Sequence, residues 1–213
     1  MKLSKKRLAQ QVIELLREEY PEVRCALEYS KPHELLIATR LSAQCTDKRV
    51  NMVTPALFER FSTVEAFAQA SQEDVEPFIM SCGLYRTKAR DIVLMCRMLR
   101  DIYGGTVPDS IEELTKLPGV GRKTANLIVG DLYGKSAFVC DTHVIRLTNR
   151  IGLADTKDAV RVERELRAAV PPEEGLLLCH RLVRHGREVC TARAPQCAGC
   201  VLRELCRYNS KGA

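Results

Sequence analysis

The 213-residue sequence predicts an all-α fold, and three observations lead to that prediction. Apolar residues recur at helical spacing in most segments, which is the pattern of amphipathic helices. Residues typical of helix starts and stops divide the chain into short units. No segment shows the sustained alternation of apolar and polar residues that a half-buried strand requires. We therefore expect about ten helices joined by short connections.

The first two helices are predicted from apolar spacing. Leu3 to Tyr20 carries apolar residues at helical intervals, and Pro21 follows as a stop signal. Residues 34–38 are short and strongly apolar, which favours a core helix.

The next helix is predicted to begin at Lys48, where either Thr46 or Asp47 can cap it. Pro55 lies inside the helical pattern that follows. Because proline removes a helix hydrogen bond and crowds the preceding turn, we expect a break there, with Thr54 capping a second piece.

Two further helix starts are predicted from capping boxes, Ser62 with Glu65 and Ser71 with Asp74. A long helix is expected from about residue 85 until Gly104, where glycine favours a helix end. Its predicted apolar face consists of Ile92, Met95, Leu99 and Ile102.

Two short helices are predicted on either side of residues 117–121, Leu-Pro-Gly-Val-Gly. Ser110 with Glu113 begins the first, which ends near Thr115. The second runs until Gly134. Its apolar positions are Ala125, Leu127, Ile128 and Leu132.

Three more helices are expected towards the C-terminus. Asp141 can cap a helix that extends through Arg150, before Gly152. Asp155 is expected to cap another that reaches Val170, and the last spans about 174–187.

The glycine hairpin at 117–121 is suited to binding a phosphate. Gly119 and Gly121 permit positive φ and place no side chain between the backbone and a partner. The free N–H groups of a hairpin and a helix start attract one anion. Lys123 follows in the first turn, and by itself such a lysine is a phosphate contact.

The composition is compatible with a polyanionic partner. The net charge is +6, and basic residues gather at the N-terminus and after Gly175. Neither a bilayer-length apolar run nor the apolar core of a signal peptide is present. We expect a cytoplasmic, nucleoid-associated monomer whose ten cysteines are not paired in structural disulfides.

Four cysteines at the C-terminal end form a candidate metal site. Cys190, Cys197, Cys200 and Cys206 are separated by six, two and five residues. Structural zinc sites usually pair two short chelate loops, whereas this spacing has one Cys-x-x-Cys and two wider loops. The spacing therefore favours a 4Fe–4S cluster and leaves zinc as the alternative. Arg193, inside the first loop, is expected to contact DNA phosphates.

Asp141 lies eighteen residues after Lys123, so one helix and a short return can bring the two into one cleft. The alternatives are a helix cap and a phosphate contact. Together, however, an amine nucleophile and a carboxylate suit displacement at a glycosidic carbon, where positive charge develops on the sugar.

These motifs resemble those of the endonuclease III family of helix-hairpin-helix DNA glycosylases, along nearly the whole chain. The motifs that carry the resemblance are LSAQCTD at 41–47, GLYRTKA at 83–89, LPGVGRKTAN at 117–126, VCDTH at 139–143 and the four cysteines.

The resemblance implies a bilobed fold, with a six-helix barrel at 25–135 and a cluster lobe at 1–24 and 136–213. It implies excision of oxidised pyrimidines from duplex DNA and strand cleavage by β-elimination. Lys123 matches the family's nucleophile and Asp141 its catalytic aspartate. Gln44 and Leu84 match the positions that fill the gap left by an extruded nucleotide, although each also suits ordinary packing or a plain surface position.

Two other classes of function remain open on the residues alone. A non-catalytic DNA-binding module would use the hairpin as a clamp and show salt-sensitive binding without base release. An electron carrier would explain the cysteines but not the hairpin or Lys123.

Overall fold

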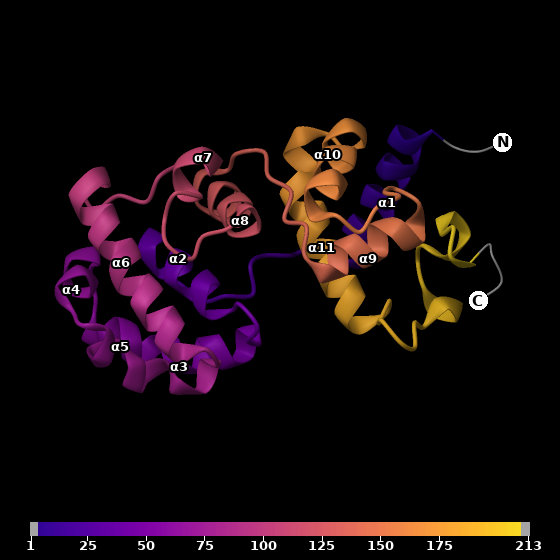
Figure 1. The fold of residues 1–213 in the computed structure, drawn as a ribbon. Helices are drawn as coiled ribbons and strands as arrows, with labels where there is room; N and C mark the ends of the chain where they lie inside the picture. The colour runs from indigo at the N-terminus through magenta and orange to yellow at the C-terminus, as the bar shows by residue number, and fades with distance from the viewer. Residues whose placement is uncertain (1–3, 210–213) are drawn as a thin grey trace. The chain divides into compact units, whose positions relative to one another are not determined.

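The computed structural model describes residues 4–209, which contain helices and no strand, so the predicted all-α class is confirmed (Figure 1). The chain divides into two compact units. One consists of residues 25–133, and the described part of the other consists of residues 4–24 and 134–209.

The unit at 25–133 contains seven α-helices and one short 3-10 helix. α6 packs against both α4 and α5, and α2 packs against α3 and α8 (Figure 1). The rings of Phe61 and Phe67 lie 5.1 Å apart in its core. The helices are α2 (Pro32–Leu41), α3 (Asp47–Arg60), α4 (Val64–Gln69), α5 (Gln72–Ile79), η1 (Met80–Cys82), α6 (Tyr85–Tyr103), α7 (Ile111–Leu114) and α8 (Arg122–Tyr133).

The other unit brings the N-terminal helix together with the C-terminal third of the chain. α11 packs against both α1 and α9, and α10 packs against α1. Its helices are α1 (Lys5–Glu19), α9 (Thr142–Ile151), α10 (Ala159–Ala169), η2 (Pro172–Glu174), α11 (Gly175–Glu188), η3 (Cys197–Gly199) and η4 (Arg203–Leu205).

Several helix starts follow the sequence prediction because local capping groups determine them. Ser71 and Asp74 form the expected box, with each side chain accepting from the other's backbone N–H. Thr46, rather than Asp47, caps α3. Ser110 accepts from Glu113 N, while the Glu113 carboxylate binds Tyr103 and Lys116 instead of closing the box.

Pro55 does not break α3, contrary to the prediction. The helix runs unbroken from Asp47 to Arg60, and Thr54 is a buried interior residue rather than a cap. A proline removes only one backbone donor. Val50, Thr54 and Leu57 lie on one buried face of the helix, and their packing maintains the helical path.

Two helices begin at a different capping residue from the one predicted. Thr63, not Ser62, begins α4 by accepting from Ala66 N, and Glu65 lies in the first helical turn. Asp158, not Asp155, begins α10. Asp155 instead binds Arg207, a residue 52 positions away, so tertiary pairing rather than local capping occupies its carboxylate.

The apolar face predicted for α6 is correct except at its end. Ile92, Met95 and Leu99 are fully buried, whereas Ile102 is 65 % exposed.

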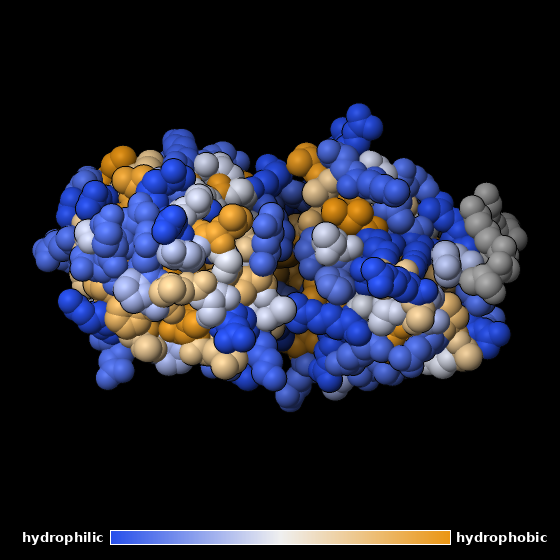
Figure 2. Space-filling view, turned by 60° about the horizontal axis from the view of Figure 1, so that its bottom comes forward, coloured by the Kyte–Doolittle hydropathy of each residue, from blue (hydrophilic) through white to orange (hydrophobic). Residues whose placement is uncertain are grey.

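Polar and charged residues cover most of the face shown in Figure 2, with apolar residues in small areas. Among residues 4–209, no helix combines the length and the apolarity needed to cross a membrane.

Candidate functional site

The predicted glycine hairpin joins α7 to α8. Leu117 N donates to Leu114 O, and Val120 N donates to Leu117 O, so two successive turns lead from one helix to the other. Ala125 N donates to Gly121 O at the start of α8. The N–H groups before this bond have no acceptor within the helix, which is the arrangement that binds an anion.

The two hairpin glycines differ in their backbone conformation and surroundings. Gly119 adopts φ +74°, and a Cβ there would lie 2.5 Å from Arg40 Nε. Arg40 is held in that place by Asp91, whose Oδ2 lies 2.7 Å from Arg40 Nη2. Gly121 has no positive φ, and a Cβ there would meet nothing within 4 Å. The fold therefore leaves no room for a side chain at Gly119, whereas Gly121 faces open space that a partner can enter.

Lys123 lies in the first turn of α8 and is exposed. It follows Gly121 and Arg122, so its side chain leaves the helix near the first N–H groups of α8. Its position thus suits both of the roles considered from sequence, a phosphate contact and a nucleophile.

Asp141 caps α9, as predicted. Its Oδ1 accepts from His143 N and Val144 N, both at 2.8 Å. Oδ2 takes no part in this cap. Asp141 belongs to the unit of 134–209 and Lys123 to that of 25–133, and the structure describes each within its own unit. That Lys123 and Asp141 share a cleft therefore stays a prediction.

Gln44 and Leu84 share an unusual backbone conformation. Their φ angles are 55° and 48°, and they are the residues other than glycine with positive φ in the described chain. This left-handed conformation costs a residue with a Cβ roughly 1–2 kcal/mol, and such strain gathers at functional sites. Leu84 is also 60 % exposed, and Gln44 is exposed.

Lys88 is a residue of this region that the sequence reasoning missed. It is fully buried, and its Nζ donates to Leu41 O at 2.8 Å and to Cys82 O at 2.6 Å. Burial lowers the pKa of its ammonium group. The available signal was its spacing, since Lys88 precedes Ile92 and Met95 on the buried face of α6.

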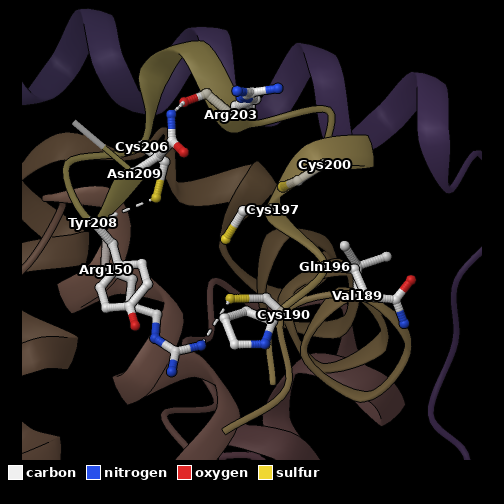
Figure 3. A pocket seen from close by; sticks show the side chains of 11 residues that line it. Arg150, Val189, Cys190, Gln196, Cys197, Cys200, Arg203, Cys206, Tyr208 and Asn209 are labelled. Atoms are coloured by element: carbon white, nitrogen blue, oxygen red, sulfur yellow. Dashed lines mark hydrogen bonds between the residues drawn. The ribbon is translucent and has the colours of Figure 1, made fainter. Parts of the chain in front are cut away.

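The four C-terminal cysteines surround a single hollow of about 310 Å³, which includes space open to solvent. Figure 3 shows their sulfur atoms directed towards this common space. Within residues 4–209, no three His, Cys, Asp or Glu side chains are grouped closely enough to hold one metal ion. Four thiols around a wider space suit a bulkier iron–sulfur cluster.

Side chains from neighbouring helices hold the cysteine segment, and sequence reasoning did not identify them. Arg150 Nη1 lies 3.2 Å from Cys190 Sγ and 2.7 Å from Thr191 O (Figure 3). Arg146 Nη2 donates to Cys190 O at 3.0 Å. His185 Nε2 lies 3.3 Å from Cys200 Sγ. The two arginines suit a thiolate-rich site because their positive charge offsets the negative charge of the thiolates.

The predicted basic residues near the cysteines differ in their contacts. Arg193 is exposed, as a phosphate contact requires. Arg207 is instead bound to Asp155, with its Nη1 2.5 Å from Oδ1, and to the Asn149 carbonyl. Arg207 thus joins the cysteine segment to the chain just beyond α9.

The comparisons with known proteins agree with this geometry. Residues 37–172 match the family model described as HhH-GPD superfamily base excision DNA repair protein, and residues 190–206 match the iron-sulfur binding domain of endonuclease III.

Two curated relatives are similar along almost their whole lengths. Endonuclease III of Synechocystis sp. is 44 % identical over 95 % of this chain and 93 % of that protein. Endonuclease III of Bacillus subtilis is 43 % identical over 93 % of this chain and 91 % of its own.

A solved structure of a trapped endonuclease III–DNA covalent intermediate is similar in fold and sequence. It has a TM-score of 0.92 and 43 % identity, and the match covers 99 % of both chains.

Proposed function

The chain belongs to the endonuclease III family, within the HhH-GPD superfamily of base excision DNA repair proteins, and from that premise we propose which residues perform each step. It is a bifunctional DNA glycosylase and abasic-site lyase that acts on DNA and carries a 4Fe–4S cluster. The observation that carries the proposal is an exposed lysine beside the phosphate-binding N–H groups of a glycine hairpin.

The proposed substrate is duplex DNA with an oxidised pyrimidine or an abasic site. The damaged nucleotide must leave the base stack, at a cost of roughly a few kcal/mol that is lowest for a weakly stacked lesion. Gln44 and Leu84 fill the gap that it leaves. Their exposure and their strained backbone support this role, because a side chain that enters a stack must project from the surface.

The hairpin binds the DNA backbone beside the extruded nucleotide. Gly121 lets a phosphate approach the N–H groups at the start of α8, since no side chain stands in that space. This contact holds the sugar near Lys123, and Arg193 adds a further phosphate contact.

Lys123 is the nucleophile in this scheme. Its Nζ forms a bond to C1′ of the sugar while the bond from C1′ to the base breaks, and the base leaves with a proton. The sugar ring then opens to give a Schiff base. Loss of a proton from C2′ breaks the C3′–O bond, which cuts the strand on the 3′ side, and water releases Lys123.

Asp141 is the catalytic carboxylate. It stabilises the positive charge that develops on the sugar and accepts a proton from the attacking amine. Because Oδ1 is engaged in capping α9, we assign these tasks to Oδ2.

Cys190, Cys197, Cys200 and Cys206 would hold the cluster, which would cross-link a terminal segment, residues 190–209, that has little apolar core of its own. The cluster would thereby maintain the conformation of the segment that carries Arg193. The protein acts as a monomer associated with the nucleoid, which sedimentation and localisation in cells can test.

The assignment of Lys123 is tested by borohydride trapping on DNA that contains thymine glycol or an abasic site. We expect wild type to form a covalent complex and Lys123→Ala to form none, because reduction needs a Schiff base. Lys116→Ala is the matched control, since Lys116 is an exposed lysine of the same unit that pairs with Glu113.

Trapping that persists in Lys123→Ala would exclude Lys123 as the nucleophile. DNA binding by wild type without base release or trapping would instead point to a non-catalytic binding module.

A further inference from the structure

Two loops that are distant in sequence carry Gln44 and Leu84. Gln44 lies in the turn after α2, which Cys45 N closes by donating to Ser42 O at 3.1 Å. Leu84 follows Gly83 in the turn between η1 and α6. The side chains of Cys45 and Cys82 are close enough to interact, so the two loops are adjacent.

Lys88 binds to both loops at once. Its Nζ donates to Leu41 O, three residues before Gln44, and to Cys82 O, two residues before Leu84. Its backbone N–H also donates to Leu84 O at 3.0 Å. One buried ammonium group therefore fixes the points from which both strained turns depart.

Burying an ammonium group without need is unfavourable, because it loses its water shell. The two carbonyls are polar groups at the ends of α2 and η1, where the chain leaves regular structure and needs donors from elsewhere. An apolar side chain at position 88 would fill the space but would not hold either turn. The ammonium group of Lys88 therefore determines the conformation of these two turns.

We propose that Lys88 is a positioning residue that holds the Gln44 and Leu84 loops together so that both side chains enter the DNA stack as one unit. The inference rests on the gap-filling role proposed above for Gln44 and Leu84. Lys88 touches no reacting atom in this scheme and acts through the two loops.

The test compares abasic sites in duplex and in single-stranded oligonucleotides. A single strand has no paired stack to enter, so gap filling affects only the duplex. We expect Lys88→Met to lower the rate of borohydride trapping on the duplex about tenfold relative to the single strand, since two charge-assisted hydrogen bonds are lost. Leu84→Ala should lower the same ratio.

The double variant Lys88→Met/Leu84→Ala separates positioning from a general loss of structure. If Lys88 acts through the Leu84 loop, the double variant should be little worse than Leu84→Ala alone. Ile92→Val is the matched control, because it trims a fully buried side chain one turn along the same helix and removes no hydrogen bond. It should leave the ratio unchanged.

Lys88→Gln provides a second variant in case Lys88→Met does not fold. Its amide keeps two N–H donors without the charge, so an intermediate ratio is expected.

The outcomes distinguish this inference from the proposal beneath it. An unchanged ratio in Leu84→Ala would refute gap filling by Leu84, and this inference with it. A lowered ratio in Leu84→Ala together with an unchanged ratio in both Lys88 variants would refute the positioning role alone. Equal losses on duplex and single strand in the Lys88 variants would make Lys88 a purely structural residue.

Discussion

Asp141 begins α9 by accepting two backbone hydrogen bonds on one carboxylate oxygen, and the proposed mechanism uses the other oxygen. A capping role and a catalytic role therefore do not exclude each other in this side chain. They depend on different properties, because a cap needs an acceptor whereas the reaction needs a negative charge.

Two substitutions at Asp141 separate these properties. Asn is as good an N-cap as Asp, so Asp141→Asn should change the free energy of unfolding by no more than a few tenths of a kcal/mol. Base release should nevertheless fall by about 100-fold or more, because the charge is lost. Asp141→Ala should lose both the activity and about 1 kcal/mol of stability.

Single-turnover excision assays and urea unfolding measure the two effects. A variant Asp141→Asn that excises bases at the wild-type rate would leave Asp141 with a capping role only.

At the scale of elements, the hairpin between α7 and α8 combines one glycine that the fold needs with one that we propose leaves room for a DNA phosphate. Gly119 has no room for a side chain, since Arg40 and Asp91 lie where its Cβ would be. Gly121 is open on that side. The same residue type thus serves internal packing at one position and external access at the other.

Alanine substitution at these two glycines should have opposite consequences. Gly119→Ala should lower the free energy of unfolding by about 2 kcal/mol or more, because positive φ is strained and Arg40 must move. Gly121→Ala should leave stability unchanged or slightly higher, because it restricts the unfolded chain. It should weaken binding to abasic-site DNA, since a methyl group enters the space left for a phosphate.

Chemical denaturation and fluorescence anisotropy with labelled duplex check these expectations. The distinction fails if Gly121→Ala destabilises the protein as strongly as Gly119→Ala does.

α9 links two parts of the proposed site within one unit. Asp141 caps its first turn, and Arg146 and Arg150 further along contact the carbonyls of the cysteine segment. Displacement of that segment would therefore act on the helix that presents the carboxylate proposed to be catalytic.

At the scale of the whole molecule, the cluster takes the place of a hydrophobic core in the C-terminal cysteine segment alone. From Cys190 to residue 209 only Leu202 is a buried apolar side chain. Metal–thiolate bonds then supply much of the folding free energy of such a segment.

Loss of one cluster ligand should loosen this part of the chain and spare the rest. We expect Cys197→Ser to lose bound iron and its visible absorption, and residues 190–209 to become sensitive to protease. Hydrogen exchange in the unit at 25–133 should stay near its wild-type rate, because that unit has its own core.

Cys96→Ser serves as the control, since Cys96 is buried in α6, which belongs to the other unit. A protease-resistant, iron-free Cys197→Ser protein would show that the segment folds without the cluster.

Much of the fold could be predicted because helix starts and stops are written in neighbouring residues. The Ser71–Asp74 box, the Asp141 cap and the glycine stops at 104, 134 and 152 act within a turn or two of the chain. Predictions failed where a distant partner intervened. Packing of the buried face of α3 keeps the helix continuous through Pro55, and Asp155 binds Arg207 instead of capping α10.

The residues of the candidate site also differ in whether the sequence alone could predict their role. The glycines, Lys123, Asp141 and the four cysteines, in this order, carry the resemblance that identified the class of protein. The purpose of Lys88 was not visible, since its acceptors lie six and 47 residues away.

The sequence by itself determined the helical class, the glycine hairpin and the grouping of the four cysteines, because periodicity, caps and ligand spacing are properties of short stretches. Only the tertiary structure decided which glycine the fold requires, which arginines hold the cysteines and why a lysine is buried in α6. The physical reason is that burial and the pairing of charges depend on groups that meet in space and are far apart along the chain.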